Sequence, residues 1–203
     1  MLTLDHVAMV GETLEEAAQA VETALGVAMQ PGGQHARFVT HNRLLGLADG
    51  LYLEAIAIDP GAPSPACPRW FDLDNMTGAP RIGNWICRTG DLDRAVACLP
   101  QAGVPVDLAR GALRWRMAVP EDGKLPFDNR FPAVMQWQTT PTPAQILTPS
   151  DCRLSRLIIA HPEAKRLRAE IAPHLVDARV IFETGLSGIR AEFDTPSGRR
   201  VLA

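Results

Sequence analysis

The chain has 203 residues, of which 46% are hydrophobic, and its formal net charge is −3 at pH 7. This length can bury one substantial core or two small fused ones. Charges of both signs are interspersed without a basic stripe, so a nucleic-acid partner is not expected. No apolar run reaches the roughly 20 residues needed to cross a bilayer, and the first residues lack a signal-peptide pattern. We therefore expect a cytoplasmic globular protein without a membrane partner.

The first 59 residues predict a β-α-β-β-β unit. Residues 2–10 form a short apolar run typical of a strand. A capping box that begins at Thr13 then starts an amphipathic helix. Short extended runs follow, with a turn predicted at Pro31–Gly33 and a hairpin at Asp49–Gly50. We take residues 1–59 as the first module.

A proline-rich linker at residues 60–80 separates this module from a second copy of the pattern. Within the linker, Arg69–Phe71 is predicted to form a short helical turn whose aromatic side chains pack as a lid or plug. The pattern then restarts, because Leu4–Val7 aligns without a gap on Ile82–Trp85. Residues 81–140 are therefore interpreted as a second β-α-β-β-β module.

A second linker at residues 141–153 leads to a third segment, residues 154–203, which we interpret as a partial or complete β-α-β-β-β-like module. Each such unit has one apolar face and one open edge, so copies must pair to close a core. An unpaired third copy also favours a homodimer. The four cysteines form no CxxC pair and are expected to be reduced thiols.

Four segments carry a resemblance to a known family: Leu4–Val7, Thr40–Leu45, Tyr52–Ile56 and Pro68–Phe71. Together they resemble the glyoxalase-like branch of the vicinal oxygen chelate superfamily, over about the first 140 residues well and the last 50 weakly. The resemblance implies an α+β fold in which repeated β-α-β-β-β modules form a curved mixed sheet, an incomplete barrel around a central cavity. Superfamily members include lactoylglutathione lyase, extradiol dioxygenases, epimerases and metal-independent drug-binding proteins.

The resemblance also implies a divalent metal, bound by the first and last strands of each module. It places His6 and Glu54 as ligands from the first module and, through the repeat alignment, Asn84 and Gln136 from the second. An imidazole and a carboxylate are strong ligands, whereas neutral amide oxygens bind metals weakly. The identity of the metal, whether Fe, Zn, Mn, Ni or Mg, is left open, as is a pocket without metal.

His41 offers a further ligand. If it faces inward, it completes a two-histidine, one-carboxylate set with His6 and Glu54, which suits an open-site metal. Asn42 must then face outward, because neighbouring residues of a strand point to opposite sides, and the sequence leaves both arrangements open. The expected metal ligands are thus His6, Glu54, His41 and Gln136, with Glu54 and His41 also as catalytic groups.

A second set of residues is expected to contact the substrate: Asn42, Trp85, Arg114, Arg116 and Gln136. Arg114 and Arg116 share one strand face and could clamp a carboxylate or phosphate, the alternative being a solvated outer face. Trp85, Trp115 and Trp137 either fill the core or wall an aromatic pocket. His35 belongs to no constellation and is assigned no role.

Three functions follow from these patterns. The leading hypothesis is a metal-dependent lyase, isomerase or dioxygenase that chelates vicinal oxygens of a small substrate. The first alternative is a metal-free protein of the same fold that binds a small molecule, with His6 and Glu54 as hydrogen-bonding groups. The second is a dimerising module without pocket chemistry.

Overall fold

The computed structural model describes residues 1–203 and contains twelve strands and five α-helices. The first unit contains β1 (Thr3–Val10), α1 (Leu14–Leu25), β2 (Gln30–His35), β3 (Thr40–Gly46), a 3-10 turn η1 (Ala48–Gly50) and β4 (Tyr52–Ile58), followed by η2 (Trp70–Asn75) in the linker. The second contains β5 (Arg81–Arg88), α2 (Leu92–Cys98), η3 (Pro100–Ala102), β6 (Val104–Arg110), β7 (Leu113–Val119), α3 (Pro126–Asn129) and β8 (Ala133–Trp137). The third, after α4 (Pro143–Ile146), contains β9 (Arg153–His161), α5 (Ala164–Ile171), β10 (Val180–Thr184), β11 (Gly188–Thr195) and β12 (Gly198–Leu202).

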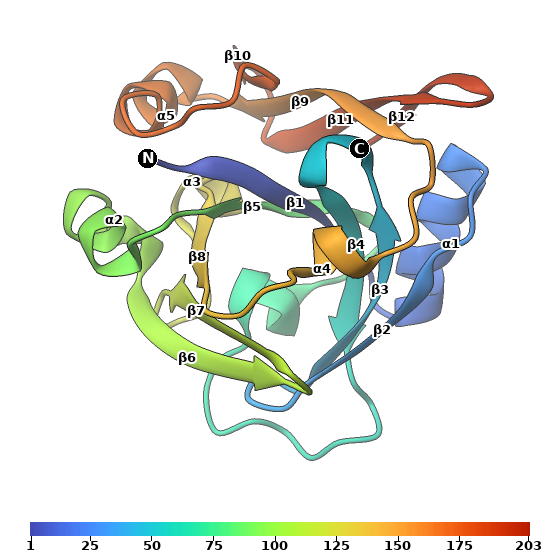
Figure 1. Cartoon of the computed structure of the whole chain (residues 1–203). Helices are drawn as coiled ribbons and strands as arrows, with labels where there is room; N and C mark the ends of the chain where they lie inside the picture. The colour runs from blue at the N-terminus through green and yellow to red at the C-terminus, as the bar shows by residue number, and fades with distance from the viewer.

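The first two units share one eight-stranded sheet with the order β2-β3-β4-β1-β5-β8-β7-β6. Within each unit the first and last strands pair in parallel, and β1 pairs with β5 antiparallel at the centre. The sheet curls so that its two edge strands, β2 and β6, come into contact (Figure 1). This architecture confirms the expected α+β fold with an incomplete barrel.

The central pairing of β1 with β5 supports the predicted repeat. Opposite His6 lies Ile86, and opposite Ala8 lies Asn84. In the gap-free alignment of the two modules, His6 corresponds to Asn84 and Ala8 corresponds to Ile86. Exchanging the two modules therefore converts the pair His6–Ile86 into the pair Asn84–Ala8. The two units are therefore related by an approximate two-fold axis between β1 and β5.

The third unit forms a separate four-stranded sheet with the order β10-β9-β11-β12. This sheet lies on the convex side of β1 and β5 (Figure 1), where Phe182 meets the edge of Trp85 at a ring-centroid distance of 6.2 Å. In the third unit the first strand, β9, pairs in parallel with the second strand, β10. In the other two units the first strand pairs in parallel with the last strand. The β-α-β-β-β order of elements is thus repeated, but the strand order is not, because α5 returns the chain directly beside β9.

Local sequence signals explain the ends of α1. Thr13 and Glu16 form the predicted capping box, and Gly26 ends the helix in the left-handed conformation at φ 72°. The buried stripe of α1 packs against β4, on the outside of the barrel. The predicted hairpin between β3 and β4 is also confirmed, with Asp49 and Gly50 both at positive φ.

The turn predicted at Pro31–Gly33 is wrong, since these residues lie within β2. Their pairing with β3 is irregular, and the Gly33 amide donates to Oδ1 of Asn42 at 2.8 Å. A Cβ at Gly32 would collide with the Asn42 side chain, and one at Gly33 would lie 2.7 Å from Cδ of Arg110. The two glycines therefore make room for side chains from β3 and β6 rather than a reversal of the chain.

We expect Gly32→Ala to lower the free energy of unfolding by about 1–3 kcal/mol, because the added methyl group would collide with both the carboxamide and the backbone carbonyl of Asn42. Gly185→Ala is the matched control, since a Cβ there meets nothing within 4 Å. Urea unfolding of both variants measures the difference. Equal stability of the two variants would show that β2 shifts freely to accept the methyl group.

The linker between the first two units first runs over the surface, with residues 61–64 exposed, and then enters the barrel at Trp70. Trp70 and Phe71 are both buried at the start of η2, and Trp70 stacks on Phe38 with ring centroids 4.4 Å apart. The plug predicted for Arg69–Phe71 is therefore confirmed, whereas the predicted helical turn is replaced by a short 3-10 turn at Trp70–Asn75 in which Phe71 and Asp72 have positive φ. None of the helices has the length and hydropathy that a membrane crossing requires.

Candidate functional site

The concave face of the curled sheet encloses a small pocket. It is lined by inward-facing residues of seven strands and by two aromatic residues of η2: His6, His35, Asn42, Leu44, Tyr52, Glu54, Trp70, Phe71, Arg110, Trp115, Met117, Met135 and Trp137. Most of them stand at alternate positions of their strands, as side chains on one face of a sheet must. The cavity leaves about 30 Å³ for the centres of water molecules, which is room for about two waters.

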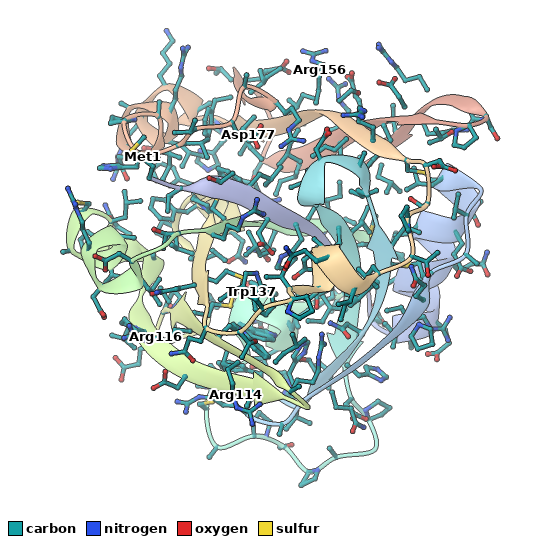
Figure 2. All side chains as sticks on the ribbon, in the orientation of Figure 1. Met1, Arg114, Arg116, Trp137, Arg156 and Asp177 are labelled. Atoms are coloured by element: carbon teal, nitrogen blue, oxygen red, sulfur yellow. The ribbon has the colours of Figure 1, made fainter.

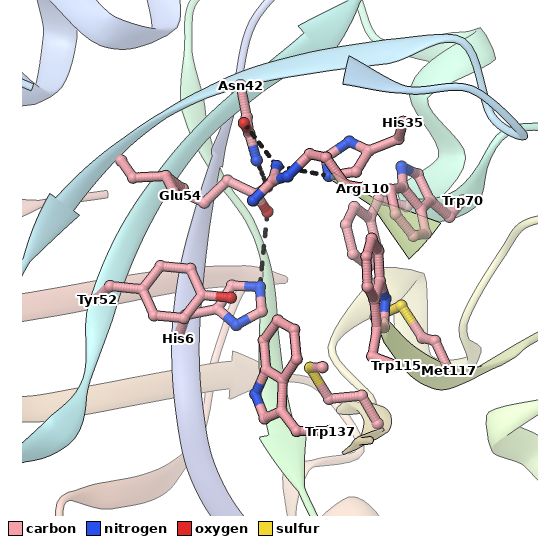
Figure 3. Close-up of a pocket in the computed structure, with 13 residues that line it drawn as sticks. His6, His35, Asn42, Tyr52, Glu54, Trp70, Arg110, Trp115, Met117 and Trp137 are labelled. Atoms are coloured by element: carbon pink, nitrogen blue, oxygen red, sulfur yellow. Dashed lines mark hydrogen bonds and ion pairs between the residues drawn. The ribbon is translucent and has the colours of Figure 1, made fainter. Parts of the chain in front are cut away.

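A buried chain of charged groups crosses the floor of this pocket. Nδ1 of His6 donates to Oδ1 of Asp5 at 2.8 Å, and Nε2 of His6 lies 3.5 Å from Oε2 of Glu54 (Figure 3). The other oxygen of Asp5 accepts from the indole of Trp137 at 3.0 Å and from Arg88 at 3.3 Å. The imidazole is thus held between two carboxylates, one on each side of the ring.

The electrostatics of this chain favour a charged histidine. Burial alone would lower the pKa of His6, but its hydrogen bonds to Asp5 and Glu54 outweigh burial and raise the pKa to about 9. Burial would likewise raise the pKa of Glu54, but His6 and Asn42 hold it down at about 2. At neutral pH the pocket therefore contains an imidazolium and an ionised Glu54 as a buried ion pair.

A second polar group lies above Glu54. The Asn42 amide donates to Glu54, and Oδ1 of Asn42 accepts from Nη1 of Arg110 at 3.0 Å (Figure 3). The same Nη1 lies 3.1 Å from Nε2 of His35. Arg110 is the last residue of β6, so its side chain reaches across the gap between the two edge strands of the barrel.

His35 acts in this group as a neutral acceptor. Its Nδ1 lies 3.0 Å from Oγ1 of Thr40, and its Nε2 faces the Arg110 guanidinium, which can only donate. Burial lowers the pKa of His35 to about 4, and the charge of Arg110 acts in the same direction. The geometry and the pKa therefore agree on an uncharged ring that receives a hydrogen bond from Arg110.

Aromatic and thioether side chains form the walls. Tyr52 stacks on His6 with ring centroids 4.3 Å apart, and burial raises the pKa of Tyr52 well above its usual value. Trp115 and Trp137 lie 5.7 Å apart on neighbouring strands. Trp70 contributes a buried indole Nε1 that has no hydrogen-bond partner in the protein. The walls thus offer flat apolar surfaces and one unused donor.

Of the expected metal ligands, the structure brings His6 and Glu54 together and leaves the other two outside the pocket. On β3 it is Asn42 that faces inward, so His41 points to the outer side of the sheet. Gln136 also lies on the outer side, where it accepts from the Leu92 amide and donates to the Gly90 carbonyl, both at 3.0 Å. These two bonds attach the start of α2 to β8.

Among the expected substrate contacts only Asn42 lines the pocket. Arg116 forms two hydrogen bonds of 2.8 Å with Asp93 of α2, and Arg114 donates to the backbone of its own hairpin. Both arginines lie outside the barrel, whereas Trp137 lies within it (Figure 2). Trp85 faces the third unit and donates to the Arg130 carbonyl at 2.8 Å.

The donor set does not fit a resident divalent cation. In the second module, Asn84 is the equivalent of His6. Glu54 lies opposite Ala8 in the first module, and Ala133 lies opposite the equivalent residue Ile86 in the second, so Ala133 is the equivalent of Glu54. Alanine offers no donor, and the Asn84 amide contacts the Asn129 carbonyl outside the pocket at 3.5 Å. His6, Glu54 and His35 remain. His6 and Glu54 are paired with each other, Nε2 of His35 is bound to Arg110, and the three side chains do not gather into a group that could hold a metal ion.

Sequence reasoning missed Arg110, His35 and Tyr52. A usable signal exists for Arg110, because it continues the alternation of Val106 and Leu108, which places a charge in phase with an apolar stripe. His35 carries no comparable signal. Its partners Thr40 and Arg110 come from two other strands, and the contact with Arg110 depends on closure of the barrel.

The comparisons with known proteins agree with this architecture. A family model described as "Glyoxalase-like domain" matches residues 4–175. The solved structure of a hypothetical protein from Staphylococcus aureus is 14% identical with a TM-score of 0.64, over 93% of this chain and 88% of that one. A search of curated proteins found no match.

Two further structures are more distant. Methylmalonyl-CoA epimerase from Mycobacterium tuberculosis is 20% identical with a TM-score of 0.44, over 68% of this chain and 88% of that one. A V278E mutant of glyoxalase I from Zea mays is 13% identical with a TM-score of 0.32, over 98% and 66%. The family model, which spans most of the 203 residues, decides the assignment: the chain belongs to the glyoxalase-like domain family.

Proposed function

We propose that this protein binds a small organic compound in the pocket of its incomplete barrel without a resident metal ion. The observation that carries the proposal is that the strong donors in the pocket are engaged within the protein. His6 and Glu54 pair with each other, and Nε2 of His35 lies 3.1 Å from Nη1 of Arg110. In this arrangement the ion pair, not a metal, is the polar centre that orients the compound. The proposal corresponds to the metal-free alternative expected from the sequence.

The shape and lining of the pocket support binding of a compact molecule with a flat apolar part. The walls are mostly aromatic and thioether side chains, and the polar groups are few and gathered at one side. A compound larger than about two waters requires that a wall move. We expect Trp70 and Phe71 to move, because they come from the linker and not from the hydrogen-bonded sheet.

Tryptophan fluorescence tests this proposal directly, since Trp70, Trp115 and Trp137 line the pocket and Trp85 lies outside it. A panel of small aromatic and aliphatic compounds is expected to contain members that quench the fluorescence saturably and raise the melting temperature. Trp137→Phe should reduce the quenching signal, whereas Trp85→Phe should preserve it. A panel without any saturable binder would contradict the proposal.

A metal titration separates this proposal from the metal-dependent enzyme expected from the family resemblance. An ion at a hundredfold excess over its Kd adds about 2.7 kcal/mol, which raises the melting temperature of a protein of this size by roughly 5–11 °C. We expect a shift of less than about 1 °C with Zn²⁺, Mn²⁺, Ni²⁺, Fe²⁺ or Mg²⁺. A larger shift that Glu54→Gln abolishes would favour the metal-dependent enzyme.

A cytoplasmic location and a homodimer stay predictions. Sedimentation at micromolar concentration tests the second of them, with the exposed face of the third sheet as the expected contact. Arg156 and Arg190 lie on that face and pair with Glu192 of the same chain.

A further inference from the structure

We propose that Arg110 is the anchor for a carboxylate group of the bound compound, so that the pocket selects small carboxylic acids. This inference rests on the proposed function and adds the chemical class of the ligand. It is carried by the position of the Arg110 guanidinium in the pocket and by the neutral character of its protein partners.

Arg110 has unused hydrogen-bonding capacity. The protein engages only Nη1, through His35 and Asn42, and neither Nε nor Nη2 of Arg110 has a hydrogen-bond partner. A guanidinium presents its donors as a planar fork that matches two carboxylate oxygens. The free side of the fork is therefore able to receive a carboxylate while the bonds of Nη1 to His35 and Asn42 are kept.

The charge of Arg110 is also not balanced by the protein. Guanidinium groups that line a pocket are usually paired with a carboxylate, because removing a charge from water is costly. Arg110 forms no salt bridge, whereas Arg88 pairs with Asp5 and Arg116 pairs with Asp93. Its partners His35 and Asn42 are neutral acceptors that fix the guanidinium without neutralising it.

A second unused donor lines the same pocket as Arg110. Trp70 adds a buried indole donor without a partner in the same pocket, which suits an oxygen-rich ligand.

One glycine of β2 makes room for the arginine. A Cβ at Gly33 would lie 2.7 Å from Cδ of Arg110, so any other residue there would have to displace the arginine side chain that passes over the strand. The same segment holds Asn42 through the Gly33 amide at 2.8 Å. The backbone of one edge strand thus receives a side chain from the opposite edge strand and directs it into the pocket.

Matched acids and amides test the inference by tryptophan quenching on the full-length protein. The probes are benzoate, phenylacetate and pyruvate, each compared with its amide, in wild type, Arg110→Met, Arg110→Lys and the control Arg114→Met. We expect at least one acid to bind wild type about 10- to 100-fold more tightly than its amide. Arg110→Met should remove this preference, Arg110→Lys should keep part of it, and Arg114→Met should keep all of it.

The outcomes separate the two proposals. Equal affinity for acid and amide in wild type, or an unchanged acid preference in Arg110→Met, would overturn the carboxylate anchor and leave the proposed function standing. Absence of any binding by acids and amides would overturn both. Circular dichroism and melting temperature show whether Arg110→Met is folded, and if it is not, the acid preference of Arg110→Lys relative to wild type decides.

Discussion

Raising the pH from 6.5 to about 9 is expected to lower the free energy of unfolding by about 3 kcal/mol through one residue, His6. The folded protein raises the pKa of this imidazole from 6.5 to about 9, because Asp5 and Glu54 bind its protonated form. The folded state therefore holds a proton that the unfolded chain releases above pH 6.5. The stabilisation is complete below that pH and is lost as the pH rises through 9.

His6→Gln provides the reference for this measurement. Glutamine keeps a hydrogen-bonding side chain but does not titrate, so other groups that titrate in this range contribute equally to both proteins. The difference between the two urea-unfolding curves, measured at intervals from pH 6 to pH 9.5, isolates His6. Parallel pH dependences in the two proteins would show that the imidazole is neutral in the folded state.

The same ion pair also makes the free energy of unfolding depend on pH in the acidic range. Because the pKa of Glu54 falls from 4.5 to about 2, its stabilisation is present above pH 4.5 and is lost as the pH falls through 2. The losses of stability at acidic and at alkaline pH both come from discharging the same His6–Glu54 ion pair, so the two free energies must not be summed. The pair is therefore expected to contribute fully between pH 4.5 and 6.5.

The fold was largely predictable because it depends on local signals and on a repeat. The capping box at Thr13 and the Asp49–Gly50 hairpin are short-range features, and the alignment of Leu4–Val7 on Ile82–Trp85 predicted a paired module. The strand order of the third sheet was not predictable. Whether β10 or the last strand lies beside β9 depends on the path of the chain after α5, which hydrophobic alternation does not encode.

The site was predictable only in part, because strand parity decides which side chains face inward. His6 and Glu54 stand out as polar residues within apolar strands, and both line the pocket. His41 and Asn42 are neighbours, so a shift of one residue exchanges them, and only the pairing of β3 with β4 places Asn42 inside. Arg110 becomes part of the site only when the sheet curls and its edges meet.

The second large effect is expected from Asp5→Asn, which should lower the free energy of unfolding by about 3–5 kcal/mol. The Asp5 carboxylate is buried and accepts hydrogen bonds from His6, Trp137 and Arg88. Asparagine keeps the shape of the side chain but removes the charge, so the imidazolium loses one of its two carboxylates. For a protein of this size the melting temperature should fall by roughly 6–20 °C.

Asp59→Asn separates this loss from the general effect of changing a buried aspartate. Asp59 is also buried, at 7% exposure, but its partners are the neutral Gln34 amide at 2.7 Å and the Gly61 backbone amide at 2.9 Å. Its replacement should cost only about 1 kcal/mol, because no buried cation depends on it. If both variants lost the same small amount, the charge of Asp5 would be irrelevant to stability.

A double-mutant cycle then assigns the loss to the pair. In a His6→Gln background the imidazolium is absent, so Asp5→Asn should cost about 0.5–3 kcal/mol less than in wild type. The part of the cost that remains belongs to Trp137 and Arg88, the other donors to Asp5. Because Trp137 also lines the pocket, the remaining cost includes the stabilisation that Asp5 gives to a side chain of the pocket wall.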